Sequence, residues 1–97
     1  MVVSTKDVTM DTRNIWGQDI QEIYDLGTRT LTDIRREYSR ARKKFAPMRG
    51  PHEGYAVILE ELDEMWDAIK ANNITDARNE ALQVAAMALA FLLEVKE

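Results

Sequence analysis

Residues 81–93 read ALQVAAMALAFLL, and Gln83 is the only polar side chain among these thirteen residues. A helix that is apolar on every face is buried on more than one side. Three helices of one short chain cannot easily cover it, and the small alanine side chains of this region permit close helix contact. We therefore expect a second subunit to pack against this helix. The alanines are Ala77, Ala81, Ala85, Ala86, Ala88 and Ala90.

A long amphipathic helix is predicted upstream, where apolar and small residues recur at alternating spacings of four and three. The narrow apolar seam of this helix runs from Ile20 to Phe45. Gly27 lies on the seam although glycine disfavours a helix, so we expect it to admit a close neighbour. The seam consists of Ile20, Tyr24, Gly27, Leu31, Ile34, Tyr38, Ala41 and Phe45.

Two prolines and one glycine interrupt the helical pattern in residues 46–51. A second helix is expected to start with Pro51 in its first turn and to end near Asn72. Either Asn73 or Thr75 can cap the third helix, because both side chains accept hydrogen bonds from free backbone N–H groups.

The fold class predicted from these patterns is all-α, since no stretch alternates as a strand would. We expect a long N-terminal helix plus two or more antiparallel helices, in a bundle completed by oligomerisation. Residues 1–12 are expected to form a tail, and residues 13–97 a single all-α domain. A lone chain of this size buries only roughly 60–65% of its unfolded surface, so oligomerisation would remedy a marginal core.

The residue types narrow the chemistry of any metal site. There are no cysteines, which excludes disulfides and thiolate ligands, and the single histidine, His52, rules out a multi-histidine site in one chain. Any metal would be bound mainly by oxygen, which favours Mg²⁺, Mn²⁺ or Ca²⁺.

Charge is distributed unevenly along the chain. Residues 1–52 carry a net +3 and residues 53–97 a net −7. Duplex nucleic acid is an unfavourable partner for a chain of net charge −4, whereas a basic segment beside an acidic one suits a metal-bound polyphosphate. The basic segment can also serve only to solvate the surface and complement a helix dipole. Its residues are Arg35, Arg36, Arg40, Arg42, Lys43, Lys44 and Arg49.

No targeting or membrane segment is expected. Residues 1–12 contain three charged side chains and no apolar run, which argues against a signal peptide. The longest apolar stretch, residues 84–95, is too short for a membrane span of about 20 residues. We therefore expect a soluble, cytoplasmic protein with no membrane partner.

Two polar clusters carry the candidate chemistry. In each cluster the outer pair is three residues apart, which puts both side chains on one helix face. Acidic clusters are often solvated surfaces, but Leu62 lies in an apolar stripe and Glu80 adjoins the apolar run. A carboxylate near a core needs a partner, either a cation or an arginine. The clusters are Glu60-Glu61-Leu62-Asp63-Glu64 and Glu80-Ala81-Leu82-Gln83.

These clusters and their surroundings resemble the MazG-like nucleoside triphosphate pyrophosphohydrolases, most of all the short, single-domain type common in phage and bacterial genomes. The resemblance covers about Phe45 to Val95. The family motif is ExxE followed by ExxD, and here Glu61-x-x-Glu64 precedes Glu80-x-x-Gln83 after fifteen residues. The matching segments are His52-Glu53-Gly54-Tyr55, Ile58-Leu59-Glu60-Glu61-Leu62-Asp63-Glu64 and Glu80-Ala81-Leu82-Gln83-Val84-Ala85-Ala86-Met87-Ala88.

The resemblance implies a Mg²⁺-dependent enzyme that hydrolyses a (deoxy)nucleoside triphosphate to a monophosphate and pyrophosphate. It also implies a homodimer or homotetramer, and Mn²⁺ is an alternative cation. Carried over by position, the metal ligands are Glu61, Glu64, Glu80 and Gln83. The catalytic residues implied are Glu60 and Glu61, with Glu60 as a further ligand or as the group that orients the attacking water.

Gln83 departs from the family pattern, which has aspartate there. Glutamine offers the metal a neutral oxygen and one less negative charge. Either the site works with weaker metal affinity or one ion fewer, or the chain is a catalytically impaired module that binds a nucleotide or a protein partner.

Substrate contacts are expected from side chains near the break between the first two helices. Lys44 and Arg49 suit phosphate contact, and Phe45 can stack on a base. His52 is a candidate for lying near the substrate, although a histidine at a helix start often makes only local hydrogen bonds. Tyr55 and Trp66 can also stack on a base, but we expect them to fill the core.

Overall fold

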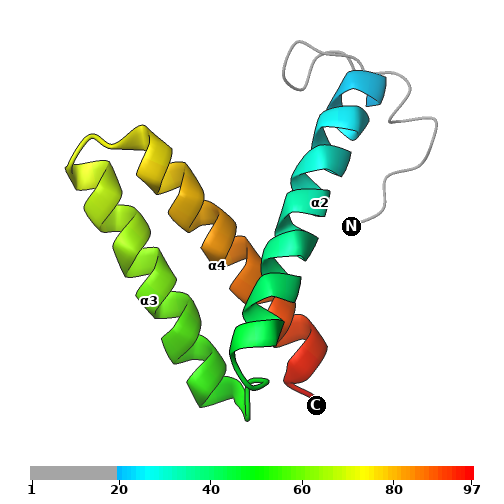
Figure 1. The fold of residues 1–97 in the computed structure, drawn as a ribbon, viewed down its shortest axis with the longest axis vertical. Coiled ribbons are helices and arrows are strands. Elements are labelled where there is room, and N and C mark those ends of the chain that lie inside the picture. Colours follow the sequence, from blue (N-terminus) through cyan, green and yellow to red (C-terminus); the bar gives the residue numbers. More distant parts are fainter. Residues whose placement is uncertain (1–19) are drawn as a thin grey trace. The chain divides into compact units, whose positions relative to one another are not determined.

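A computed structural model of the chain describes the backbone of residues 20–97 and the side chains of residues 24, 25 and 27–97 (Figure 1). Three helices lie in this range: α2 (Ile20–Lys44), α3 (Pro51–Lys70) and α4 (Ile74–Glu94). Residues 20–97 contain no strand, so the all-α class is confirmed. The expected tail, residues 1–12, lies outside the described residues.

The chain divides into two compact units, residues 1–31 and 32–97. In the first unit, the described residues belong to α2. The position that a Cβ would take at Gly27 has no described atom within 4 Å, so the close neighbour expected there is not seen. The second unit contains the rest of α2 and all of α3 and α4, and it holds the candidate site.

Within the second unit, α3 and α4 run antiparallel and lie side by side (Figure 1). The turn between them passes through Asn72, whose φ of 59° is in the left-handed region that asparagine tolerates. Asn73 then caps α4, because its side-chain oxygen accepts a hydrogen bond from the Asp76 N–H at 3.0 Å. Of the two capping residues considered from the sequence, the structure uses Asn73.

Small residues make the closest contacts between these two helices. Ala86 and Ala90 of α4 are buried, and so is Gly54 of α3. A Cβ added to Gly54 would lie 2.5 Å from Cδ2 of Phe91 and 3.2 Å from Sδ of Met48. Part of the alanine-rich surface of α4 is therefore covered by this chain itself.

The described residues bury no large side chain completely. Tyr55 and Trp66 of α3, which we expected to fill the core, are 65% and 55% exposed. That expectation was wrong for the single chain because the side of α3 that packs on α4 is formed by smaller neighbouring residues. Some apolar side chains of α3 therefore pack against α4, whereas others, such as Tyr55 and Trp66, are exposed.

Alanine substitutions at Gly27 and Gly54 should have opposite effects on the free energy of unfolding. Gly54→Ala places a methyl group against Phe91, so we expect it to lower the free energy of unfolding by about 1–3 kcal/mol. Gly27→Ala places its methyl group where no atom of the described residues lies within 4 Å, so we expect a gain of about 0.5–1 kcal/mol from helix propensity. Urea unfolding of both variants measures the difference. Equal shifts in the two variants would contradict the close contact at Gly54.

Candidate functional site

Three carboxylates from the two packed helices meet in one place. Glu61 and Glu64 stand one turn apart on α3, and Glu80 comes from α4. One carboxylate oxygen of each residue lies within 4.8 Å of the others. Glu61 and Glu80 are partly buried, whereas Glu64 is exposed. The structure thus brings together the three acidic side chains that the sequence predicted as metal ligands.

The environment of Glu61 disfavours its charge. Burial is the main cause that raises the pKa of the Glu61 carboxyl to about 7, and the neighbouring charge of Glu64 and a hydrogen bond with Glu80 act in the same direction. The charges of Glu80 and Glu60 add smaller contributions. Near neutral pH the Glu61 carboxyl is therefore about half protonated, so a bound cation would have to displace this proton.

The donor set fits a hard divalent cation. Carboxylate oxygens are the preferred protein ligands of Mg²⁺ and Mn²⁺, and Mg²⁺ commonly keeps several waters beside one or two carboxylates. A cation placed among Glu61, Glu64 and Glu80 would remove the repulsion that now raises the pKa of Glu61. The residues present are thus suited to the metal that the family resemblance implies.

A cavity of about 530 Å³ opens beside this cluster. Its walls come from the end of α2, the loop that follows, α3 up to Glu61 and α4 from Gln83 onward. This volume is within the range of small-molecule sites, about 300–1,000 Å³. Five sequence-predicted site residues line it: Phe45, Arg49, Glu60, Glu61 and Gln83.

Glu61 is the residue that the cavity shares with the carboxylate cluster. Glu64 and Glu80 belong to the cluster but do not line the cavity. Gln83 lines the cavity one helical turn beyond Glu80 on α4, as Glu60 and Glu61 of α3 do.

Two predicted substrate contacts lie elsewhere. Lys44 and His52 are exposed and do not line the cavity. The Lys44 ammonium lies 5.7 Å from the centroid of the Phe45 ring, so it is close to one cavity residue through a cation–π contact. His52 stands in the first turn of α3.

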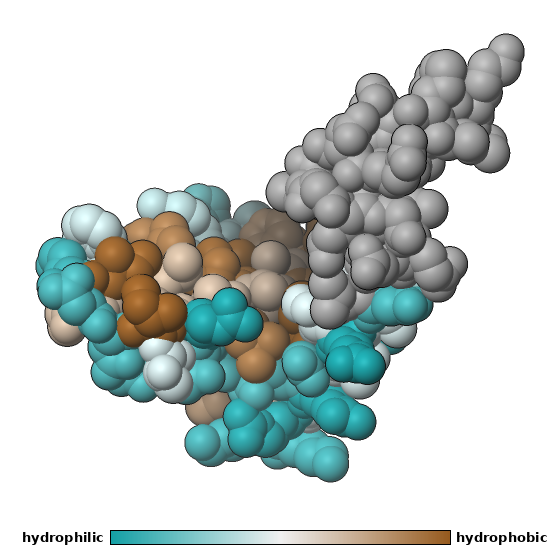
Figure 2. All heavy atoms as spheres, turned by 90° about the horizontal axis from the view of Figure 1, so that it is seen from above, coloured by the Kyte–Doolittle hydropathy of each residue, from teal (hydrophilic) through white to brown (hydrophobic). Residues whose placement is uncertain are grey.

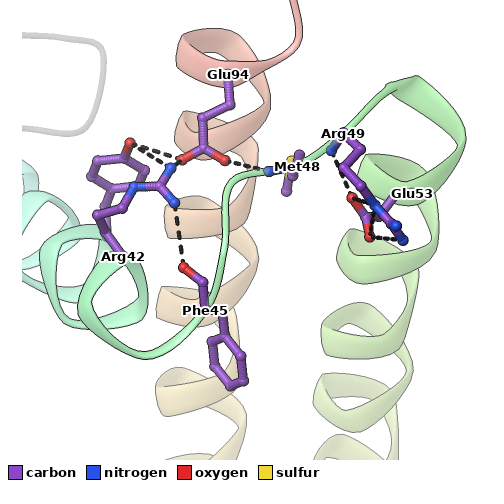
Figure 3. A network of polar contacts seen from close by, with 7 residues as sticks. Arg42, Phe45, Met48, Arg49, Glu53 and Glu94 are labelled. Carbon is purple, nitrogen blue, oxygen red and sulfur yellow. Dashed lines mark hydrogen bonds and ion pairs between the residues drawn. The ribbon is translucent and has the colours of Figure 1, made fainter.

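Arg49 is paired within its own segment. Its guanidinium donates to Glu53 at 3.0 Å, and its backbone N–H donates to the same carboxylate at 2.6 Å (Figure 3). These hydrogen bonds hold the pKa of Glu53 below its usual value. Both residues line the cavity, so a phosphate reaching Arg49 would compete with Glu53 for the guanidinium.

Glu94 is a cavity residue that the sequence analysis missed. Its carboxylate, in the last turn of α4, is 10% exposed and accepts hydrogen bonds from three directions (Figure 3). The Tyr38 hydroxyl donates at 2.8 Å, the Arg42 guanidinium forms an ion pair, and the Met48 N–H donates at 2.9 Å. One carboxylate therefore joins α2, the α2–α3 loop and α4.

A signal for this role was present in the sequence. Glu94 is the only charged residue between Ala81 and Val95, and a charge in such a run requires a partner. The partner could not be identified from the sequence, because Arg42 is one of several basic residues at the end of α2 and helical spacing does not say which of them faces α4.

No family model matches the chain, and no curated protein or solved structure matches it significantly. Between residues 20 and 97, no helix combines the length and apolarity needed to cross a membrane.

The raised pKa of Glu61 predicts a pH-dependent stability. Because the folded chain binds this proton more tightly than the unfolded chain, whose carboxyl titrates near 4.5, stability falls as pH rises from about 4.5 to about 7. We expect the melting temperature of the metal-free protein to decrease between these pH values. In Glu61→Gln, the part of this decrease that comes from the titration of Glu61 should be absent. Mg²⁺ should raise the melting temperature more at about pH 8 than at about pH 5, since binding requires deprotonated ligands.

Asp63→Asn is the matched control for this measurement, because Asp63 is an exposed carboxyl on α3 outside the cluster. The control should keep the wild-type pH dependence and the Mg²⁺ response. If Glu61→Gln behaves like Asp63→Asn, the electrostatic description of the cluster is wrong.

Removing the charge of Glu94 should loosen the second unit. We expect Glu94→Gln to lower the free energy of unfolding by about 1–3 kcal/mol, since it leaves the partly buried Arg42 without its counter-charge. Glu97→Gln, at an exposed position, should change it by less than about 0.5 kcal/mol. Chemical denaturation measures both, and hydrogen exchange at the Met48 amide should accelerate only in Glu94→Gln. Equal stability of the two variants would exclude a structural role for Glu94.

Proposed function

We propose that this chain is a MazG-like, Mg²⁺-dependent hydrolase that converts (deoxy)nucleoside triphosphates to monophosphates and pyrophosphate. The observation that carries the proposal is the position of Glu61, which belongs both to the three-carboxylate cluster and to the wall of a ligand-sized cavity. A cation held by the cluster would therefore lie next to a substrate in the cavity. The motif resemblance supports the same activity.

The metal ligands in this proposal are Glu61, Glu64 and Glu80, with Mn²⁺ as an alternative to Mg²⁺. When bound, the metal supplies charge neutralisation for the triphosphate and lowers the pKa of a bound water. Glu60 lines the cavity next to Glu61 in the sequence, and its proposed role is to accept a hydrogen bond from the attacking water. The amide oxygen of Gln83 offers a further neutral contact from the facing helix.

Residues of the cavity wall near the α2–α3 loop are the proposed substrate contacts. Arg49 can donate two hydrogen bonds to a phosphate if its pairing with Glu53 opens, and the ring of Phe45 can stack on a base. Lys44 lies beside Phe45 and can add positive charge at the entrance, whereas His52 is assigned only a place near the loop. Nucleoside triphosphates are intracellular metabolites, so the proposed location of this activity is the cytoplasm. The proposed assembly is a homodimer or homotetramer, as the family resemblance implies.

One observation favours a second candidate function. Gln83 lines the cavity where a carboxylate would add a negative charge close to Glu60 and Glu61. In this second candidate, the neutral amide leaves a chain that binds a nucleotide or a protein partner without efficient turnover. Isothermal calorimetry separates the candidates, because Mg²⁺-dependent nucleotide binding without product formation supports the second.

Pyrophosphate release from a panel of nucleoside triphosphates tests the proposed activity directly. We expect Mg²⁺-dependent release with at least one substrate and a loss of about 100-fold or more in kcat/KM in Glu61→Gln, since that change removes a metal ligand. Asp63→Asn should retain activity. The hydrolase proposal is wrong if the folded wild-type protein releases no pyrophosphate, or if Glu61→Gln is as active as the wild type.

Gln83→Asp distinguishes the two candidates. If the site is a working one with reduced metal affinity, the variant should lower the Mg²⁺ concentration needed for half-maximal activity by about 10-fold, because a charged ligand binds Mg²⁺ better than an amide. If the chain only binds nucleotide, Gln83→Asp should tighten Mg²⁺ binding without product appearing. If Gln83→Asp leaves the Mg²⁺ dependence unchanged, Gln83 is not a ligand of the metal.

A further inference from the structure

Two ion pairs lie on the cavity wall, and they differ in how far solvent reaches them. The side chains of Arg42 and Glu94 are 31% and 10% exposed, so this pair is largely enclosed. The side chains of Arg49 and Glu53 are 86% and 37% exposed. Water screens the charges of so open a pair, and the pair therefore contributes little to stability. The Arg49 guanidinium can exchange Glu53 for another anion at little cost.

Glu53 occupies the hydrogen-bonding groups that Arg49 would offer to a phosphate (Figure 3). Its Oε2 accepts from Nη2 of Arg49 at 3.0 Å and from Nε at 3.3 Å. Its Oε1 accepts from the backbone N–H of the same arginine at 2.6 Å. These hydrogen bonds lower the pKa of Glu53, so the carboxylate is charged at neutral pH. A guanidinium binds a carboxylate and a phosphate through the same N–H groups, so the two ligands exclude each other.

Positive charge is scarce on the cavity wall. Among the described residues that line it, two arginines stand against four glutamates. Arg42 is held by Glu94, a largely enclosed partner, which leaves Arg49 as the cation on this wall that an entering phosphate can recruit. The pairing of Arg49 with Glu53 therefore determines how strongly the wall attracts phosphate oxygens.

We propose that Glu53 is an internal competitor of the phosphate ligand: its carboxylate holds Arg49 while no phosphate is bound, and pyrophosphate displaces it. Any phosphate that uses Arg49 must first break the pair, so the pair lowers the affinity of the cavity for pyrophosphate. When pyrophosphate leaves, the carboxylate takes Arg49 back at the high effective concentration of a group on the same chain. This inference rests on the proposed function, because it takes the product pyrophosphate as the ligand, and it adds that Glu53 limits product inhibition.

A purely structural role for the pair makes a different prediction. Hydrophilic side chains cover much of the face seen in Figure 2, so an exposed ion pair is not by itself a sign of function. An acidic residue in the first turn of a helix such as α3 can also serve only the helix dipole. Neutralising such a residue would change stability, but it would not strengthen the binding of an anion. A gain in pyrophosphate affinity therefore separates the two roles.

Calorimetric titration with pyrophosphate in the presence of Mg²⁺ tests the proposal on Glu53→Gln. Glutamine keeps an oxygen that can accept the Arg49 N–H but loses the charge that holds the guanidinium. We expect the dissociation constant to fall by about 3- to 10-fold. Asp63→Asn removes one negative charge from α3 outside the cavity, so this control should change the constant by less than about 2-fold. Unchanged or weaker binding in Glu53→Gln, or pyrophosphate that binds to neither protein, would overturn the inference.

A double-mutant cycle separates competition for Arg49 from general charge repulsion. Arg49→Gln alone should weaken pyrophosphate binding. In that background, Glu53→Gln should change the dissociation constant by less than about 2-fold, because no guanidinium remains to be released. Both side chains are exposed to solvent, so all three variants should fold, and urea unfolding checks this. If Glu53→Gln strengthens binding equally with and without Arg49, Glu53 acts by repulsion and the inference is wrong.

The binding experiment needs no turnover, so its outcome can be distinguished from that of the hydrolase proposal. If the chain releases no pyrophosphate from nucleotides but Glu53→Gln still binds pyrophosphate more tightly, the hydrolase proposal is wrong and the competition stands. If the chain is an active hydrolase, Glu53→Gln should lower the inhibition constant of pyrophosphate by the same factor as its dissociation constant. An active hydrolase in which neither constant changes would contradict the competition alone.

Discussion

The close approach of α3 to α4 at small residues is the constraint on which the rest of the second unit depends. Gly54 lies against Phe91, and Ala86 and Ala90 are buried, so the two helix backbones can come near each other. Only at that distance can Glu80 of one helix share a space with two carboxylates of the other. The Phe91 ring of α4 occupies the space that Gly54 of α3 leaves by having no side chain. The acidic cluster therefore depends on this close packing of the two helices.

The electrostatics of Glu61 connect the cluster to its surroundings. Its pKa of about 7 means that a proton and a divalent cation compete for one place near neutral pH. A purely structural carboxylate would instead be paired as Glu94 is, with a guanidinium, a hydroxyl and a backbone N–H around it. Glu94 therefore has a positive partner, whereas Glu61 has none among the described residues. That contrast, rather than the number of acidic residues, favours a functional role for the cluster.

Local features could be predicted from the sequence because they depend on neighbouring residues. The break at Pro51, the cap at Asn73 and the shared face of Glu61 and Glu64 all follow from backbone chemistry and helical spacing. The role of Glu94 could not be predicted, since it depends on a side chain 52 positions away. The exposure of Trp66 was also missed, because apolar spacing marks a side chain for burial without saying which surface will bury it.

α3 carries two different sides, and only one of them serves the candidate site. Glu61 lines the cavity, whereas Tyr55 and Trp66 on another side of the helix are exposed. A ligand set requires close geometry, and a displacement of about one ångström can disturb it. The position of Glu61 relative to Glu80 therefore depends on how α3 packs against α4, where Gly54 lies against Phe91. A change at that contact should alter metal affinity as well as stability.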